Sequence, residues 1–221
     1  MMQPVVKRNA KLLLLSFSAV IFLCVVSYFF IDIPAALFFH SQAGDIRKVS
    51  EIVTRLGVST WYLVLSMLGF VFYRFVRRRT VPANRMLFIF IAIAASGILN
   101  NILKFLLGRY RPNMLFNEHL YGFTFFSVGH ACNSFPSGHA NTITALALAL
   151  YLITRRYGLA YLLLALLVMA SRIVVGAHYP SDVLFGSYLA VVTTLAVKTA
   201  FENRGFALEQ ASERGQFSGA S

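Results

Sequence analysis

Long runs of apolar residues, separated by short polar segments, organise this chain. A helix that crosses a bilayer needs about 20 mostly apolar residues, and the runs that reach or approach this length are 12–31, 59–76, 86–106, 138–154, 157–175 and 182–200. The pattern predicts an all-α polytopic membrane protein with six transmembrane helices. No long linker divides the runs, so we expect a single six-helix domain over residues 1–202. The polar composition of residues 203–221 predicts a disordered tail.

In one polar segment between the first two runs, the apolar residues recur with the period of a helix. Apolar residues recur at helical spacing among the charges of residues 44–57, at Ile46, Val49, Ile52, Val53 and Leu56. This pattern predicts an amphipathic helix that lies on the outer surface of the membrane. We expect a structural rather than a catalytic role for it.

The distribution of basic residues predicts the orientation in the membrane. They gather before the first run, around the second-to-third connection, in the fourth-to-fifth turn and after the sixth run: Lys7, Arg8, Lys11, Arg74, Arg77, Arg78, Arg79, Arg85, Arg155, Arg156, Lys198 and Arg204. Because cytoplasmic loops carry an excess of Lys and Arg, these segments are expected to be cytoplasmic. Both termini then lie inside, and residues 32–58, 107–136 and 176–181 lie on the opposite side of the cell (inner) membrane.

Composition supports the membrane assignment and explains the charge. The chain is 58% hydrophobic and 13% charged, with a mean hydropathy of +0.69, which is more apolar surface than one soluble core buries. Its formal net charge of +12 follows mostly from the cytoplasmic basic segments, which also favour anionic lipid headgroups. We therefore expect membrane lipid as the partner and no nucleic acid, and nothing in the pattern indicates an oligomeric state.

Charged residues gather at the predicted outer edge of the membrane. The stretch "KFLLGRYRP" carries Lys104 and Arg111, and the stretch "SRIVVGAHYPSD" carries Arg172, His178 and Asp182. A charged side chain at the bilayer centre costs about 2.5–3.5 kcal/mol on insertion scales. These groups are therefore expected to face one shared polar cavity.

A helix start lies at the same edge. In "FPSGHANT", residues 135–142, Pro136 and Ser137 precede a long apolar run. The first backbone N–H groups of a helix have no intrahelical acceptor and form a cradle for anions. Gly138 permits close approach of a ligand, Ser137 adds a hydroxyl, and His139 stands beside the bound group.

A metal ion and a phosphate are the two ligands to weigh for this cavity. His139, His178 and Asp182 are acceptable metal ligands, but Lys104, Arg111 and Arg172 would repel a divalent cation. The same cations complement a phosphate of charge about −1.5 to −2. No Cys-x-x-Cys pair is present to hold a structural metal. We expect a phosphate site without metal or cofactor.

Three segments, in this order, resemble the signature motifs of the type 2 phosphatidic acid phosphatase superfamily. "KFLLGRYRP" fits Lys-x6-Arg-Pro, "PSGH" fits Pro-Ser-Gly-His, and "SRIVVGAHYPSD" fits Ser-Arg-x5-His-x3-Asp. The region that they organise runs from about residue 86 to 200. A match in three parts with fixed spacing is far more specific than one short motif. The six runs resemble the membrane-bound bacterial lipid phosphatases of the superfamily.

The resemblance implies a role for each residue of the motifs. His178 corresponds to the nucleophile that forms a phosphohistidine, Asp182 to the residue that orients it, and His139 to the general acid for the leaving oxygen. The phosphate-binding set of the family corresponds to Lys104, Arg111, Ser137, Gly138 and Arg172. Arg109 is expected to be no more than an extra phosphate contact.

The predicted position of the site indicates a class of substrate, a phosphate or diphosphate attached to a lipid. A site at the outer membrane edge suits a lipid phosphate or diphosphate, so undecaprenyl diphosphate, phosphatidylglycerol phosphate, phosphatidic acid and lipid A phosphate are candidates. The long aromatic-rich outer loop over 112–135 resembles the loops of bacterial members, including lipid A phosphatases. Two alternatives remain: a lipid phosphotransferase that uses the same phosphohistidine, and a transporter that only binds lipid phosphate.

Overall fold

The computed structural model describes residues 3–42 and 44–208, so most of the predicted tail, 209–221, lies outside the described residues. The described chain is all α and contains no strand, as the sequence predicts. Its elements in chain order are α1 (Gln3–Phe30), α2 (Asp32–Ser41), α3 (Asp45–Val53), the 3₁₀ turn η1 (Thr54–Gly57), α4 (Ser59–Val71), the π-helical turn η2 (Phe72–Val76), α5 (Thr80–Leu107), α6 (Pro112–Glu118), α7 (Gly138–Thr154), α8 (Gly158–Val174) and α9 (Pro180–Asn203).

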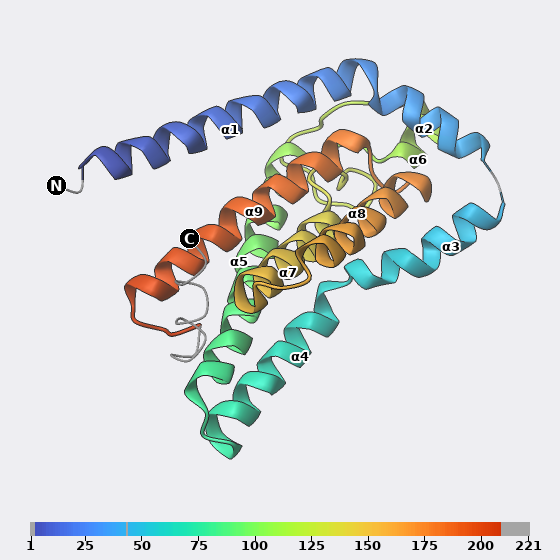
Figure 1. Ribbon diagram of the computed structural model, residues 1–221. Helices are drawn as coiled ribbons and strands as arrows, with labels where there is room; N and C mark the ends of the chain where they lie inside the picture. Colours follow the sequence, from blue (N-terminus) through green and yellow to red (C-terminus); the bar gives the residue numbers. More distant parts are fainter. Residues whose placement is uncertain (1–2, 43, 209–221) are drawn as a thin grey trace.

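Helix α7 is the centre of the bundle. It packs against α5, α8 and α9, while α4 packs along α5 and α1 lies along α9 (Figure 1). The short α4–α5 and α7–α8 turns lie at the same end as both described ends of the chain, and α2, α3, α6 and residues 108–137 lie at the other end (Figure 1). All three motifs therefore meet at one end of the bundle.

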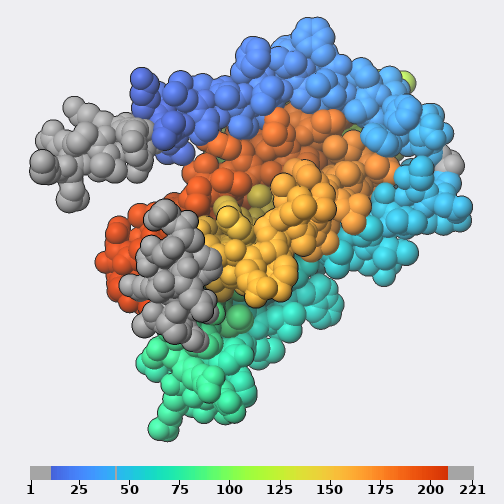
Figure 2. All heavy atoms as spheres, in the orientation of Figure 1, coloured from blue at the N-terminus to red at the C-terminus, as the bar shows by residue number. Residues whose placement is uncertain are grey.

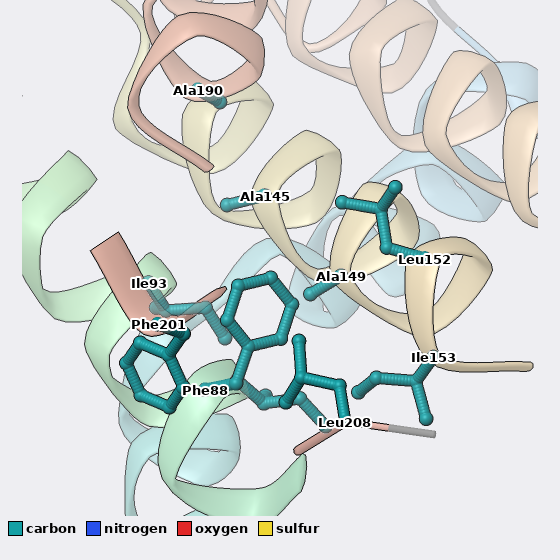
Figure 3. Close-up of a cluster of buried hydrophobic side chains, with 10 residues drawn as sticks. Phe88, Ile93, Ala145, Ala149, Leu152, Ile153, Ala190, Phe201 and Leu208 are labelled. Carbon is teal, nitrogen blue, oxygen red and sulfur yellow. The ribbon is translucent and has the colours of Figure 1, made fainter. Parts of the chain in front are cut away.

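Small residues let the helices approach closely in the core. Figure 3 shows a cluster that contains Ala145 and Ala149 of α7, Ala190 and Phe201 of α9 and Phe88 of α5, and all but Phe201 are fully buried. Alanine at a helix contact permits short interaxial distances, and helices in membranes pack largely through such contacts.

The chain beyond α9 also packs on this core. Leu208 is 8% exposed and joins the cluster of Phe88 and Phe201 (Figure 3). Its carbonyl oxygen accepts a hydrogen bond from Nε of Arg85 at 2.7 Å, and that of Ala207 accepts one from Asn84 Nδ2 at 3.2 Å. The packed chain therefore continues past the predicted domain boundary at residue 203.

Within residues 3–42 and 44–208, four segments are long and apolar enough to cross a membrane: Lys11–Phe30, Asp45–Val76, Thr80–Leu107 and Pro180–Asn203. The predicted runs at 138–154 and 157–175 are helices α7 and α8, with 17 residues each. At about 1.5 Å per residue each is roughly 25 Å long, somewhat short of a hydrocarbon layer of about 30 Å. The second segment joins the predicted amphipathic helix, α3, to the predicted span at 59–76.

The outside of the bundle is apolar, as a lipid-facing surface requires. Phe30 of α1 is 73% exposed, Trp61 of α4 67% and Leu159 of α8 69%. Figure 2 shows α1 along one edge of the molecule, where much of its surface lies open. The protein is thus membrane-embedded through several helices.

Candidate active site

The first motif spans the end of α5, the connection that follows it and the start of the short helix α6. Lys104 lies in the last turn of α5 and is 8% exposed. Pro112 occupies the first turn of α6, where a missing N–H costs nothing. Between them the backbone N–H of Arg111 donates to the carbonyl oxygen of Ala131 at 2.9 Å. This bond ties the first motif to the segment before the second.

Residues 131–134, the segment that precedes the second motif, contact both of the other motifs. The carbonyl oxygen of Asn133 accepts from Lys104 Nζ at 2.6 Å and from a terminal nitrogen of Arg111 at 3.4 Å. The backbone N–H of Ser134 donates to the carbonyl of Arg109 at 3.0 Å. This short segment therefore sets where the cations of the first motif lie.

His178 and Asp182 meet through Ser134. The Nδ1 atom of His178 lies 2.8 Å from the carbonyl oxygen of Ser134 and 3.7 Å from Oδ2 of Asp182. The same Oδ2 accepts from the Ser134 hydroxyl at 2.6 Å and from the backbone N–H of Tyr179 at 2.8 Å. The carboxylate is thus held within electrostatic range of the imidazole, while a carbonyl is its direct hydrogen-bond partner.

This arrangement selects one tautomer of His178. A carbonyl oxygen can only accept, so Nδ1 carries the proton and Nε2 carries the free lone pair. Burial, aided by the charges of Lys104 and Arg111 and opposed by Asp182, lowers the pKa of His178 to about 3. The ring is therefore neutral near pH 7, which is the form that a nucleophile requires.

The second motif begins α7. Ser137 is its N-cap residue, and its backbone N–H donates to the carbonyl of Asp182 at 2.9 Å. Helix α9 passes so close that a Cβ at Gly186 would lie 2.6 Å from the carbonyl oxygen of Ser137, so only glycine fits there. At Gly138 the nearest atom to an added Cβ is 3.7 Å away, so packing within the chain does not itself demand glycine at that position.

The third motif contributes Arg172 from the end of α8. Arg172 is 8% exposed, and a terminal nitrogen donates to the hydroxyl of Thr54 in η1 at 2.5 Å. In the same turn a Cβ at Gly57 would lie 2.7 Å from Cβ of His139. The end of the predicted amphipathic segment therefore forms a wall of the site, which the expectation of a purely structural role did not include.

The predicted site residues thus surround one region. The charges of Arg172, Arg111 and Lys104 all act on His139, and those of Lys104 and Arg111 act on His178. Within the described chain, none of these cations forms an ion pair with a carboxylate. Their positive charge would complement an anionic ligand.

Several buried polar atoms of the same residues lack a hydrogen-bond partner. Among the described residues these include Oγ of Ser137 and Nε of Arg111 and of Arg172. Buried donors are normally satisfied, and phosphate oxygens would accept from such groups. The donor set thus fits a phosphate better than a divalent cation.

Arg109 differs from its neighbours. It is fully buried, and its terminal nitrogens donate to Asp182 Oδ1 at 2.5 Å and to Asp32 Oδ2 at 2.7 Å. Both ends of the guanidinium are therefore occupied by carboxylates. The expectation that Arg109 is an extra phosphate contact is wrong, because the side chain has no terminal nitrogen left over for that purpose.

Sequence reasoning missed residues that act on the site from outside the motifs. Ser134 and Asn133 contact the site through backbone carbonyls, which no side-chain pattern reveals, and Ser134 adds its hydroxyl. Thr54, Gly57 and Asp32 lie far from the motifs in the chain, and only the folded bundle brings them there. Of these residues only Asp32 had a signal in the sequence, because an acidic residue at the end of an apolar run indicates a functional role.

Comparison with known proteins shows the family to which the chain belongs. The sequence profile of the PAP2 superfamily matches residues 85–206. A lipid A 1-phosphatase from Rhizobium etli is 32% identical over 168 residues, covering 70% of this chain and 72% of the relative. A lipid A 1-phosphatase from Rhizobium johnstonii is 30% identical over 185 residues, covering 77% of this chain and 75% of the relative. The chain therefore belongs to the PAP2 superfamily, and it is a phosphatase of the membrane-bound type.

A solved structure shares the fold. It is the crystal structure of a transmembrane PAP2-type phosphatidylglycerolphosphate phosphatase from Bacillus subtilis, with a TM-score of 0.63 and 22% identity. The similarity covers 85% of this chain and 94% of that chain. The likeness therefore extends over the helices that precede the matched profile.

Proposed function

We propose that the protein is a metal-independent lipid phosphatase that forms a phosphohistidine at His178. The observation that carries the proposal is the 2.8 Å contact between Nδ1 of His178 and the carbonyl oxygen of Ser134, which leaves Nε2 free in a ring close to Lys104 and Arg111. A neutral nucleophile inside a cationic pocket is what attack on a phosphate ester requires. Phosphate release from lipid by purified protein tests it.

In the first step Nε2 of His178 attacks phosphorus and the bond to the lipid oxygen breaks. His139, protonated, donates its proton to the departing oxygen, so the lipid leaves as a neutral alcohol. Lys104, Arg111 and Arg172, with the backbone N–H of Gly138 and the hydroxyl of Ser137, hold the phosphoryl oxygens. The imidazole of His178 becomes cationic, and Asp182 at 3.7 Å stabilises that charge.

In the second step water replaces the lipid. His139 is now neutral and takes a proton from the water as its oxygen attacks phosphorus, and the P–N bond to His178 breaks. Inorganic phosphate leaves and His178 returns to its neutral form. A lipid alcohol in place of water would give the phosphotransferase, so analysis of products with an added alcohol separates the two activities.

The proposal includes six spans, with α7 and α8 as short transmembrane helices beside α1, α4, α5 and α9. Both are apolar, and 17 residues are at the lower limit of known spans of about 17–25. Both termini are then cytoplasmic in a cell (inner) membrane, and the site opens on the extracytoplasmic side. The six helices form one domain.

Lipid A phosphate is our first candidate substrate. Two relatives at 30% identity or more carry the name lipid A 1-phosphatase, which favours it over phosphatidylglycerol phosphate, phosphatidic acid and undecaprenyl diphosphate. Purified protein should release phosphate from lipid A with a higher kcat/KM than from the other lipids. A transporter would bind these lipids and release none.

Labelling of single cysteines tests the orientation. In a background in which Cys24 and Cys132 are serine, a cysteine at Glu118 is expected to react with an impermeant thiol reagent in intact cells, because α6 lies at the extracytoplasmic end. A cysteine at Arg78, in the α4–α5 turn, should react only after the cells are broken. The reverse pattern would place the chemistry on the cytoplasmic side.

Chelation and vanadate test the phosphate site. EDTA is expected to leave phosphate release unchanged, because Lys104, Arg111 and Arg172 supply the positive charge that a metal would otherwise supply. Vanadate should inhibit competitively, as a mimic of the transferred phosphoryl group. Activity that EDTA abolishes and zinc or magnesium restores would contradict the metal-independent mechanism.

A further inference from the structure

A buried ion network lies on the far side of Asp182 from His178. Arg109 donates from one terminal nitrogen to Asp182 Oδ1 at 2.5 Å and from the other to Asp32 Oδ2 at 2.7 Å. The side chains of all three residues are at most 1% exposed. Solvent does not screen these charges, so the position of one fixes the position of the others.

Aromatic rings hold the guanidinium in place. Its central carbon lies 4.4 Å from the ring centroid of Tyr179, 5.0 Å from that of Tyr28, 5.3 Å from that of Tyr121 and 5.5 Å from that of Phe123. The hydroxyl of Tyr121 also accepts from Arg109 at 3.0 Å. A cation packed among rings has few alternative rotamers, so Arg109 holds one terminal nitrogen fixed against Asp182 and the other against Asp32.

Asp32 anchors the other end of the network. It lies at the first position of α2, where its Oδ1 accepts from the Ser27 hydroxyl at 2.7 Å and from the backbone N–H of Ser181 at 3.1 Å. Its Oδ2 accepts from the Ser181 hydroxyl at 2.5 Å. Ser181 directly precedes Asp182 in the first turn of α9, so Asp32 fixes the backbone from which Asp182 projects.

We propose that Asp32 and Arg109 are positioning residues that set the place and the charge of Asp182, and through it those of His178. The inference rests on the proposed function, because it concerns the nucleophile of that mechanism. Asp32 lies outside the matched profile at residues 85–206. The N-terminal helices would then take part in the chemistry by completing the site.

The charges give the network a second task. Asp182 and Arg109 together are neutral, and Asp32 returns the net charge of the network to −1. When Nε2 of His178 bonds to phosphorus, the ring becomes a cation of charge +1. The net charge of −1 on the network stabilises this cation. Asp32 therefore supports the phosphohistidine although it contacts neither His178 nor the bound phosphate.

Steady-state kinetics of Asp32→Asn provide the test, with phosphatidic acid in detergent micelles as the probe. We expect kcat to fall about tenfold or more, as when the partner of a site residue is removed. KM and inhibition by vanadate should stay within about twofold of the wild type, because the phosphate-binding cations are untouched. The control is Asp45→Asn, which removes an exposed carboxylate paired with Lys48 and should change nothing.

A double variant separates positioning from a structural role. Arg109→Met alone leaves two buried carboxylates without a cation, whereas Asp32→Asn/Arg109→Met restores the net charge of −1 and should unfold at a higher temperature than Arg109→Met. Its kcat should nevertheless stay low, since Asp182 Oδ1 has lost its donor. A merely structural role predicts that kcat recovers together with the unfolding temperature.

The outcomes distinguish this inference from the proposed function. A kcat within about twofold of the wild type in Asp32→Asn or in the folded double variant would overturn the inference, as would a loss confined to KM and vanadate inhibition. If His178→Ala is inactive in the same assay, the proposed function stands while the inference falls. If His178→Ala keeps its activity, the proposed function itself fails.

Discussion

His178→Ala is expected to reduce phosphate release by about four orders of magnitude or more, because it removes the nucleophile and no other group in the described site replaces it. The loss should be equal for every lipid in the panel and for nitrophenyl phosphate, since all share the phosphoenzyme step. Release of phosphate is measured from purified protein in micelles, at a temperature below the unfolding midpoint.

The matched control is His119→Ala. His119 is exposed and directly follows α6 at the same end of the bundle, so the same substitution there should keep activity close to that of the wild type. Activity that survives in His178→Ala while its fold is intact would mean that another group attacks phosphorus.

His139→Ala is expected to have an effect that depends on the leaving group. General acid catalysis contributes about 10²–10⁴-fold, so turnover of a lipid phosphate should fall by that order. For nitrophenyl phosphate the leaving group hardly needs a proton, and formation of the phosphoenzyme should fall far less. The measurement is the rate of the first nitrophenol burst in wild type and variant, compared with single-turnover release of the lipid alcohol.

The opposite pattern would reverse the assignment. If the better leaving group rescued His178→Ala and not His139→Ala, His139 would be the nucleophile and His178 the acid. The proton on Nδ1 of His178, directed at the carbonyl of Ser134, is the structural reason to expect the first pattern.

The sequence predicted the helices and the motif residues for different reasons. The apolar runs predicted the long helices because length and hydropathy are local properties of the chain. Apolar runs also predicted α7 and α8. These helices have 17 residues each, and that length alone does not decide whether they cross the membrane. The cations gathered at the predicted outer edge, Arg111 and Arg172 among them, predicted an anion site, and the motif spacing carried the resemblance to the superfamily.

The parts of the site that the sequence did not reveal depend on tertiary packing. The partner of His178 Nδ1 is a backbone carbonyl at Ser134, and every residue has such a carbonyl. Arg109 sits between Lys104 and Arg111 in the chain but turns away from them to Asp182 and Asp32. The end of the predicted surface helix reaches Arg172 through Thr54. Each of these contacts joins segments that are distant in the sequence.

Trapping the covalent intermediate tests the central claim most directly. His139→Ala incubated with nitrophenyl phosphate should form the phosphoenzyme and hydrolyse it slowly, since the same residue activates the water. After quenching in base, which preserves phosphohistidine, tandem mass spectrometry should find the phosphoryl group on His178. A phosphoryl group on another residue, or steady release of phosphate with no covalent adduct, would contradict the account.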